Sequence, residues 1–387
     1  MDPAHTPRES QAGSHALIAG GGTGGHVFPG LAVAGELTRR GWRVSWAGAA
    51  SSMEEKLCKK SGLEFHTLAA RPLVGRGPLG KARALWTLGR SALGARRMVR
   101  RLGAQVVLGT GGYVSAGAVL GGVLAGVPVL LLEPNAEAGF ANLWLSRYAN
   151  EAYLAFAGEK RLRCPVQVTG IPVRAEFFDV APQLPFGSPL KILVLGGSQG
   201  ARQLNELLPA AFALLPESLG RVVIRHQTGS RHQESVKESY QQKDLPVTSV
   251  EGGGWRPDGP RLQVETPAFI QHMASAMAES HLVLSRAGAI TLAELCAAGR
   301  PSLLLPLEAA GGHQKRNAER LVEAGAARLV DGAATPEALA ETLAGLLADR
   351  ARLTGMADAA RRLGRPDSAA AIADRLEYWA ARRRGKS

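Results

Sequence analysis

Residues 16–30 read ALIAGGGTGGHVFPG, and this stretch decides how the chain folds. A short apolar run ends in a glycine cluster, and a helix-like segment follows from Leu31 to Arg40. We expect a strand, a tight loop and a helix, because glycine accepts positive φ and lets the backbone approach a ligand closely. The helix N-terminus would present unpaired N–H groups and partial positive charge to a phosphate. The alternative interpretation is a strand-to-helix turn that binds nothing.

The spacing of Gly20, Gly22 and Gly25 also fits the fingerprint of enzymes that bind dinucleotides. That fingerprint needs an acidic residue about 20 residues on, at the end of the next strand. The next expected strand, 42–48, reads WRVSWAG, and no acid appears before Glu54, which weakens this interpretation. His26 follows the glycines directly, and an imidazole at this place is either a structural cap or a catalyst.

Length and composition predict a globular protein of two domains with an anionic partner. The 387 residues exceed one ordinary core. The net charge of +13 favours nucleic acid, a phosphorylated substrate or an acidic membrane surface as that partner. Three widely spaced cysteines predict neither a disulfide framework nor a metal site, which fits a reducing compartment. Residues 1–15 are polar and lack the apolar core of a signal peptide.

The opening pattern occurs twice. Residues up to about Pro172 alternate expected strands and helices, which predicts a parallel sheet with helices on both faces. The Pro-rich stretch 182–189 has the composition of a linker. An apolar strand (190–195, LKILVL), a glycine loop (196–201, GGSQGA) and a helix (202–215) then follow. Two phosphate-type loops, each opening its own α/β half, predict twin Rossmann-like domains with a ligand between them.

The uncharged stretch 103–132 is long enough to span a bilayer. Its many glycines and Pro128 argue against one continuous helix. We expect a strand (105–108), a glycine loop (109–112), a helix (115–125) and a second strand (128–132), because buried parallel strands also appear as continuous apolar runs.

The second half of the chain contains three further expected helices, the first of which should face the cleft with its N-terminus. A strand at 281–284 leads to a helix at 289–298, with Glu294 in its second turn. The polar loop 311–317, GGHQKRN, starts another helix. The last helix, capped by Asp367 or Ser368, carries the apolar stripe Ile372, Leu376 and Trp379.

The basic residues are unevenly distributed. Between Glu64 and Glu133 there is no acid, yet nine Lys or Arg occur between Arg71 and Arg101. Apolar residues are interleaved with them: Leu79, Leu85, Trp86, Leu88 and Leu93. This segment is either a solvated helix over an apolar core or an interfacial helix that binds anionic lipid. Nucleic acid is disfavoured, because no recognised nucleic-acid module accompanies the charge.

Five stretches resemble the MurG family of bacterial N-acetylglucosaminyltransferases, which convert lipid I to lipid II in peptidoglycan synthesis. They are GGTGGHVFPG (21–30), GGYVS (111–115), GGSQGA (196–201), GAITLAE (288–294) and the segment 313–318, in which HQ precedes NA. The resemblance implies a GT-B glycosyltransferase with two Rossmann-like domains facing a central cleft. It also implies a peripheral enzyme on the cytoplasmic face of the cell membrane, acting in cell-wall biogenesis, cell shape and cell division.

By the same resemblance, an N-terminal domain at 14–173, joined by the C-terminal helix 366–387, forms the acceptor and membrane side. A C-terminal domain at 187–365 binds the donor, UDP-N-acetylglucosamine (UDP-GlcNAc). The implied donor contacts are Thr23, Gly24, Gly25, Asn135, Arg174, Ser198, Ile270, Ala289, Ile290, Thr291, Leu292, Ala293, Glu294 and Gln314. Ser198 and nearby amides would hold the diphosphate, and Glu294 would accept hydrogen bonds from ribose hydroxyls. Ile270 would meet the uracil edge through its backbone, and Asn135 and Gln314 would bond the sugar.

Three departures from the family pattern stand out. Residues 132–135 read LEPN where the family usually has HEQN, so the placement of Asn135 is open. Ile171 stands where an Asn normally precedes Pro-Val-Arg, which leaves Arg174 intact. The glycine-rich stretch 251–260 has the character of an insertion, and no role is assigned to it.

The resemblance implies inverting transfer, in which the 4-hydroxyl of the acceptor's N-acetylmuramyl (MurNAc) unit attacks the anomeric carbon and UDP departs. His26 is the candidate general base. Loop amides and helix N-termini would stabilise the leaving diphosphate, and the loops 22–25 and 109–112 would hold the acceptor's diphosphate. No Asp-x-Asp occurs, so we expect no metal held by that motif, and no cofactor. The alternatives are a UDP-sugar 2-epimerase on the same scaffold and a nucleotide-sugar-binding membrane adaptor.

Overall fold

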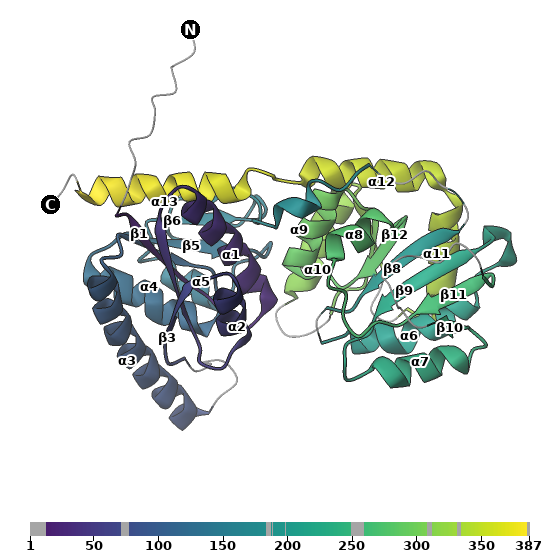
Figure 1. Cartoon of the computed structure of the whole chain (residues 1–387), viewed down its shortest axis with the longest axis horizontal. Helices are drawn as coiled ribbons and strands as arrows, with labels where there is room; N and C mark the ends of the chain where they lie inside the picture. Colours follow the sequence, from purple (N-terminus) through teal and green to yellow (C-terminus); the bar gives the residue numbers. More distant parts are fainter. Residues whose placement is uncertain are drawn as a thin grey trace, which may run out of the picture. The chain divides into compact units, whose positions relative to one another are not determined.

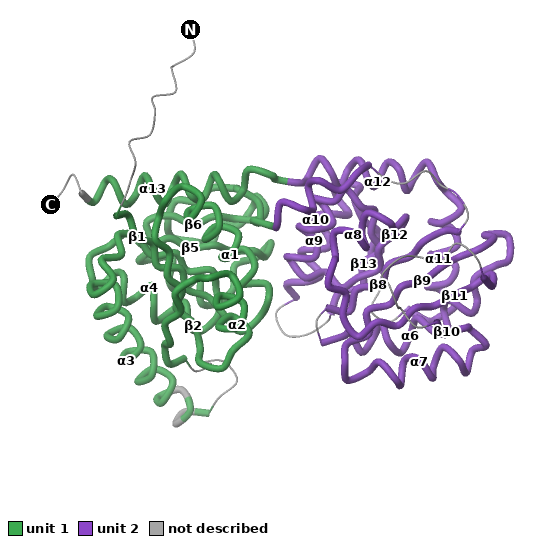
Figure 2. The backbone as a smooth tube through the Cα atoms, in the orientation of Figure 1, with its two compact units in different colours: residues 1–173, 365–387 green, residues 174–364 purple. Residues whose placement is uncertain are grey.

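The computed structural model describes residues 13–70, 77–182, 187, 189–197, 199–248, 259–307, 312–330 and 334–384. The chain divides into two compact units (Figure 2). Unit 1 comprises Met1–Val173 with Arg365–Ser387, and unit 2 comprises Arg174–Gly364. Unit 1 is therefore discontinuous in sequence.

Several expectations fall outside the described residues. Ser198 and most of the stretch 251–260 are among them, as is most of the Pro-rich segment 182–189. The side chain of Leu79 also lies outside them.

Unit 1 contains a seven-stranded sheet in the order β3-β2-β1-β4-β5-β6-β7, and all neighbouring strands are parallel. The strands are β1 (His15–Ala19), β2 (Arg43–Gly48), β3 (Glu64–Thr67), β4 (Val106–Gly109), β5 (Val129–Glu133), β6 (Glu151–Leu154) and β7 (Val166–Val168). β1, β4, β5 and β6 are buried at every position, and this burial explains the apolar runs in β1, β4 and β5; β6 instead begins with the buried Glu151.

Helices cover both faces of this sheet (Figure 1). They are α1 (Gly24–Arg39), α2 (Met53–Lys60), α3 (Pro78–Leu102), α4 (Tyr113–Ala125), α5 (Phe140–Leu145) and α13 (Ser368–Arg384). On one face, Leu37 of α1 and Leu376 of α13 pack in the same apolar cluster as Ile18. On the other, Val99 of α3 and Val119 of α4 pack with Leu17. The last helix of the chain thus completes the core of the first unit.

The uncharged stretch 103–132 folds as strand, loop, helix and strand, as predicted: β4, α4 and β5. No helix in the described part of the chain is both long enough and apolar enough to cross a membrane.

Unit 2 has a second seven-stranded parallel sheet, in the order β10-β11-β9-β8-β12-β13-β14. Its strands are β8 (Leu190–Leu195), β9 (Val222–Gln227), β10 (Val247–Thr248), β11 (Leu262–Glu265), β12 (Leu282–Ser285), β13 (Ser302–Leu304) and β14 (Ala327–Leu329). Its α-helices are α6 (Arg202–Ala213), α7 (Gln233–Gln241), α8 (Met273–Ala278), α9 (Ala289–Ala298), α10 (His313–Glu323), α11 (Pro336–Ala348) and α12 (Arg350–Leu363), with short 3-10 turns η1 (Ala175–Phe177) and η2 (Glu217–Leu219).

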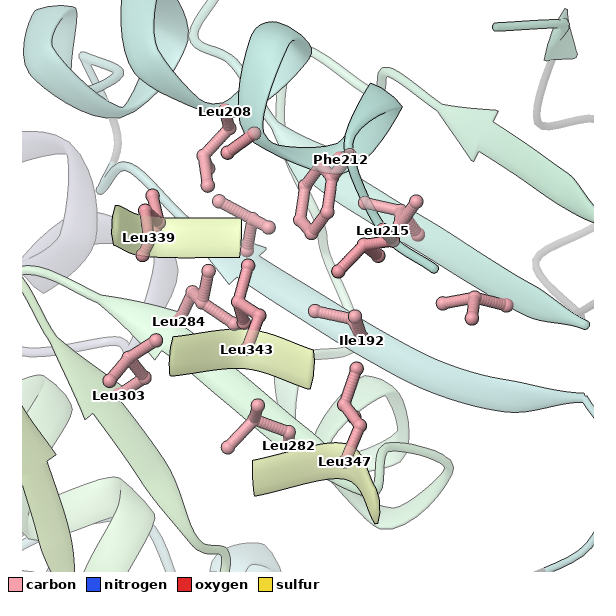
Figure 3. Close-up of a cluster of buried hydrophobic side chains, with 14 of the residues drawn as sticks. Ile192, Leu208, Phe212, Leu215, Leu282, Leu284, Leu303, Leu339, Leu343 and Leu347 are labelled. Carbon is pink, nitrogen blue, oxygen red and sulfur yellow. The ribbon is translucent and has the colours of Figure 1, made fainter. Parts of the chain in front are cut away.

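The core of unit 2 is rich in leucine. Leu339 and Leu343 of α11 pack with Phe212 of α6 against strand residues such as Ile192 (Figure 3). This cluster holds α6 beside β8, and so fixes the two ends of the glycine loop that joins them.

One helix begins earlier than the sequence predicts. α1 starts at Gly24, not Leu31, and Thr23 precedes it in an extended conformation (φ −143°, ψ 156°). The prediction was wrong because Gly24, Gly25 and Pro29 all have low helix propensity, and tertiary packing overrides that weak preference. As a result, His26 lies in the first turn of a helix.

Candidate active site

Several of the predicted site residues lie in loops at the point where the strand order of each sheet reverses. In unit 1, β1 lies between β2 and β4, and in unit 2, β8 lies between β9 and β12. In each sheet, the strand that follows the first one in sequence lies on one side of it, and a later strand lies on the other side. The loops after the carboxyl ends of such strands form the usual ligand crevice of open α/β sheets. The segments 20–26 and 110–112 lie there in unit 1, and 196–197, 199–201 and 286–294 in unit 2.

The two glycine loops of unit 1 pack directly on each other. A Cβ on Gly20 would collide with the Thr110 hydroxyl, and one on Gly112 with the carbonyl oxygen of Gly21. Gly111 has φ +106°, and a Cβ there would strike the His26 ring. Glycine is thus required at these positions by close backbone approach. The two loops are therefore more than flexible connections, because Gly20, Gly111 and Gly112 leave no room for a side chain.

His26 is held by the second of these loops. Its Nδ1 lies 3.0 Å from the carbonyl oxygen of Thr110, and the Thr110 hydroxyl donates to the carbonyl oxygen of His26 at 2.7 Å. Because a carbonyl only accepts, Nδ1 carries the proton and Nε2 is the ring's acceptor. Burial lowers the pKa of the His26 imidazole below its ordinary value of 6.5, and Glu133 and the Thr110 carbonyl oppose this shift. The ring is neutral at pH 7 and Nε2 can accept a proton.

Glu133, a buried carboxylate at the end of β5, is a site residue that was not predicted from the sequence. One oxygen accepts hydrogen bonds from the backbone N–H and side-chain amide of Asn135, both at 3.0 Å. The other accepts from the Gly139 N–H and the Asn142 amide, both at 2.9 Å. Glu133 therefore shapes the loop that presents Asn135. The sequence feature that could have identified Glu133 is its position as an acidic residue at the end of the apolar run 129–132.

Gln227 is the second residue without an assigned role, and it connects two parts of unit 2. This buried side chain donates to the carbonyl oxygen of Gly197 at 2.8 Å and accepts from the Ile270 N–H at 3.1 Å. It ties the glycine loop 196–201 to the segment around Ile270. Because the Ile270 N–H already donates to Gln227, the backbone group of Ile270 that could bind a nucleobase is its carbonyl oxygen, as a hydrogen-bond acceptor.

The helix α9 brings Glu294 close to Arg174. Ala289, Ile290 and Thr291 form its first turn, so their N–H groups have no partner within the helix. Burial raises the pKa of Glu294 to about 7, although Arg174, whose Nη2 lies 3.9 Å from Glu294 Oε1, opposes the shift. Arg174 also pairs with Glu176 at 2.9 Å.

The remaining residues predicted to contact the donor differ in burial and in their hydrogen bonds. The Leu292 side chain is fully buried, and its N–H donates to the Gly288 carbonyl. Ala293, one residue on, is half-buried. Gln314, in the first turn of α10, accepts from the Leu307 N–H at 2.9 Å. Thr23, Gly24 and Gly25 lie at the start of α1, where the two glycines are half-buried.

Two family models cover most of the chain. The glycosyltransferase family 28 N-terminal domain matches residues 16–154, and the family 28 C-terminal domain matches residues 191–373. A curated relative from Ectopseudomonas mendocina is 44% identical over 366 residues, which is 92% of this chain and 96% of the relative. Its name is UDP-N-acetylglucosamine–N-acetylmuramyl-(pentapeptide) pyrophosphoryl-undecaprenol N-acetylglucosamine transferase. The chain belongs to the MurG family.

Further comparisons agree with this MurG assignment. A relative of the same name from Azotobacter vinelandii is 40% identical over 365 residues, covering 94% of this chain and 98% of its own. The crystal structure of Acinetobacter baumannii MurG has a TM-score of 0.76 at 32% identity, covering 94% of this chain and 99% of that one. The predicted family, GT-B fold and glycosyltransferase class are confirmed.

A different enzyme shares the fold alone. A structure described as a putative UDP-N-acetylglucosamine 2-epimerase from Listeria monocytogenes has a TM-score of 0.64 at 13% identity, covering 92% of this chain and 94% of that one. The scaffold therefore does not separate transferase from epimerase, whereas the sequence of this chain places it with the MurG transferases.

Proposed function

We propose that this chain transfers N-acetylglucosamine from UDP-GlcNAc to the 4-hydroxyl of MurNAc in lipid I, forming lipid II for peptidoglycan synthesis. The observation that carries the proposal is its 40–44% identity, over more than nine-tenths of its length, to relatives named for this transfer. The epimerase alternative is supported only by a shared fold at 13% identity.

In the proposed reaction, His26 removes the proton of the acceptor hydroxyl as that oxygen attacks the anomeric carbon and the bond to UDP breaks. The neutral ring with its accepting Nε2 suits a general base at neutral pH. One direct displacement inverts the anomeric centre. Unit 1 is the acceptor side in this proposal, because it carries His26 and the paired glycine loops.

Unit 2 is the donor side. The N–H groups at the starts of α6 and α9, with the amides of the loop 196–201, would stabilise the diphosphate as charge develops on the leaving group. Ser198, in that loop, remains a proposed contact. Glu294 would accept from the ribose hydroxyls, and the carbonyl of Ile270 would accept from the uracil N–H.

The proposed membrane surface lies on α3. Buried Ala84, Ser91 and Ala95 account for the side of α3 that packs in the unit. Leu85 and Trp86, however, are 59% and 65% exposed. A helix that merely covers a core has no need of these exposed apolar side chains.

The surroundings of Trp86 favour an anionic membrane. The guanidinium of Arg90 lies 4.8 Å from the centre of the Trp86 ring, and no acid occurs between Glu64 and Glu133. We infer peripheral binding to the cytoplasmic face, where the acceptor lipid would be reached without a spanning helix.

A transfer assay with UDP-GlcNAc and a short-chain lipid I analogue tests the function. We expect UDP release only when the acceptor is present, with one N-acetylglucosamine added per UDP released. Conversion of UDP-GlcNAc to its C2 epimer in the absence of acceptor, with UDP still attached to the sugar, would instead support the epimerase. Tight UDP binding with no turnover of the complete mixture would support the adaptor.

A further inference from the structure

Unit 1 has a pocket at the amino-terminal ends of its strands, whereas the glycine loops lie at the carboxyl-terminal ends. It has a volume of about 430 Å³ and lies where β5 and β6 begin. Its lining includes Val127, Pro128, Asn150, Trp379, Arg382 and Arg383. His26 follows the carboxyl end of β1, and all strands of this sheet are parallel. The pocket is therefore distinct from the candidate active site.

The two arginines of the pocket have no carboxylate partner among the residues that the structure describes. Arg382 donates to the Tyr378 hydroxyl at 2.6 Å and stacks 5.7 Å from the Trp379 ring. Within the described ranges, neither Arg382 nor Arg383 forms an ion pair with a carboxylate. Arg375, two turns earlier on the same helix, instead pairs with buried Glu151 at 2.9 Å.

The other polar group of the lining is also a donor. Asn150 Oδ1 accepts from the Val129 N–H at 2.9 Å, which fixes the amide and leaves its NH₂ group as the polar end. Trp379 donates its indole N–H to Glu151 at 3.0 Å, so its ring contributes apolar surface. Two guanidinium groups, an amide NH₂ and an apolar wall thus surround the space.

Basic residues at a helix C-terminus also offset the helix dipole, by about 0.3–1 kcal/mol each. This effect would place arginines in the last turn of α13, but it requires neither a pocket nor a fixed amide donor across from them. The combination of Asn150 with Arg382 and Arg383 selects for an anion, because all three side chains offer N–H donors to the pocket.

We propose that this pocket binds a phosphate monoester. Its phosphate lies against Arg382, Arg383 and the Asn150 amide, and its apolar part lies against Trp379 and Pro128. Arginine suits phosphate because its planar fork donates two parallel hydrogen bonds. The volume falls in the range of small-ligand pockets. Either a soluble phosphate monoester or the headgroup of phosphatidic acid carries this chemistry.

Calorimetry on the full chain tests the proposal with phenyl phosphate as the soluble probe. Saturating UDP is present throughout, so that the donor site cannot take up the probe. We expect Arg382→Ala/Arg383→Ala to weaken binding at least about tenfold. Asn150→Asp should do the same, because it keeps an acceptor for the Val129 N–H but adds negative charge.

The matched control removes two charges elsewhere. Arg352→Ala/Arg362→Ala changes two exposed arginines of α12, in unit 2, and should leave phenyl phosphate binding unchanged. An equal loss in this control would show nonspecific charge attraction and overturn the proposal. Thermal unfolding of each variant confirms that the fold is retained.

A second arm identifies the source of the phosphate. Sedimentation uses phosphatidylcholine vesicles that contain phosphatidic acid. The α3 surface is unchanged in these variants, so a loss of vesicle binding on changing Arg382 and Arg383 assigns the phosphate to lipid. Phenyl phosphate binding with unaltered vesicle binding assigns it to a soluble compound. If the variants change neither measurement, the pocket is not a phosphate site.

Discussion

His26 is the residue on which the proposed chemistry depends. We expect His26→Ala to lower kcat by about 10²–10⁴-fold, because a general base contributes that much. Its hydrogen bond to Thr110 lies within unit 1, so the affinity for UDP should stay close to that of the parent. Steady-state kinetics with calorimetric titration of UDP measures both. Near-normal turnover would remove His26 from the mechanism.

The pH dependence of the rate offers a second check on this residue. Because burial lowers the pKa of His26 below 6.5, the neutral base persists on mild acidification. We expect kcat, measured with both substrates saturating so that the titration of Glu294 in the free protein does not contribute, to be flat from about pH 8 down to about pH 6.5 and to fall only below that range. A decline that begins well above 6.5 would contradict the assignment.

Glu294 predicts a pH-dependent affinity for the donor. Its pKa is raised to about 7, so the free protein holds a partly protonated carboxyl at neutral pH. Ribose hydroxyls favour the carboxylate, and the affinity for UDP should therefore rise from about pH 6 to about pH 8. Glu294→Gln should lack this component, and Glu294→Ala should lose about 1.5–3 kcal/mol of binding.

The comparison with Glu294→Gln isolates the residue, because the phosphates of UDP titrate equally in both proteins. Calorimetric titrations at three pH values suffice. Equal affinity of the parent and Glu294→Ala for UDP would rule out the proposed ribose contact.

Individual site residues could be predicted from the sequence only where they lie next to a recognisable motif in the chain. His26 is adjacent to the glycines and could be singled out, as could Glu294 in its helix. Gln227 could not, because its partners Gly197 and Ile270 lie 30 and 43 residues away in the sequence. Glu133 could not either, because only the fold shows that the loop directly after it turns back to donate to its carboxylate. No spacing along the chain encodes those partners.

At the scale of elements, most strands and the helix α9 could be predicted, because buried parallel strands are apolar runs between glycine loops. The start of α1 could not. Its first turn is stabilised by contacts with the loop after β4, which outweigh the poor helix propensity of glycine.

The exposed surface of α3 makes a prediction at this scale. We expect Leu85→Ser/Trp86→Ser to reduce binding to anionic vesicles, because it removes the exposed apolar side chains. Arg83→Glu/Arg90→Glu should reduce binding too. Added salt should weaken binding by the parent, since surface charge is screened within about 8 Å at physiological ionic strength. Sedimentation with vesicles measures each effect.

The control for α3 is Leu214→Ser/Val322→Ser, which changes exposed apolar residues of unit 2. It should sediment as the parent does, and all variants should keep their UDP affinity. Undiminished sedimentation of both α3 variants would show that this helix is not the docking surface.

At the scale of the whole molecule, unit 1 depends on the end of the chain. Ile372 and Leu376 of α13 are fully buried beside α1, and Arg375 and Trp379 hold the buried carboxylate of Glu151. We expect truncation after Gly364 to destabilise unit 1 severely, because each lost apolar side chain contributes about 1.5–3 kcal/mol. Glu151 would also lose its paired charge.

Scanning calorimetry would follow this truncation. The transition of unit 1 should move to lower temperature or vanish, whereas that of unit 2, whose core lies within 174–364, should remain. Truncation after Arg384 removes only the last residues and serves as the control. Unchanged transitions in the shorter protein would show that α13 is dispensable.

The discontinuity of unit 1 also determines the order in which a ribosome can complete the two units. Unit 2 has all of its residues once Gly364 emerges, but unit 1 still lacks the helix that covers Ile18 and Leu37. Domains generally fold as units during synthesis, the N-terminal one first. Here that order is reversed at the last step: the unit that is begun first is completed after unit 2, and its apolar face stays uncovered until α13 has emerged.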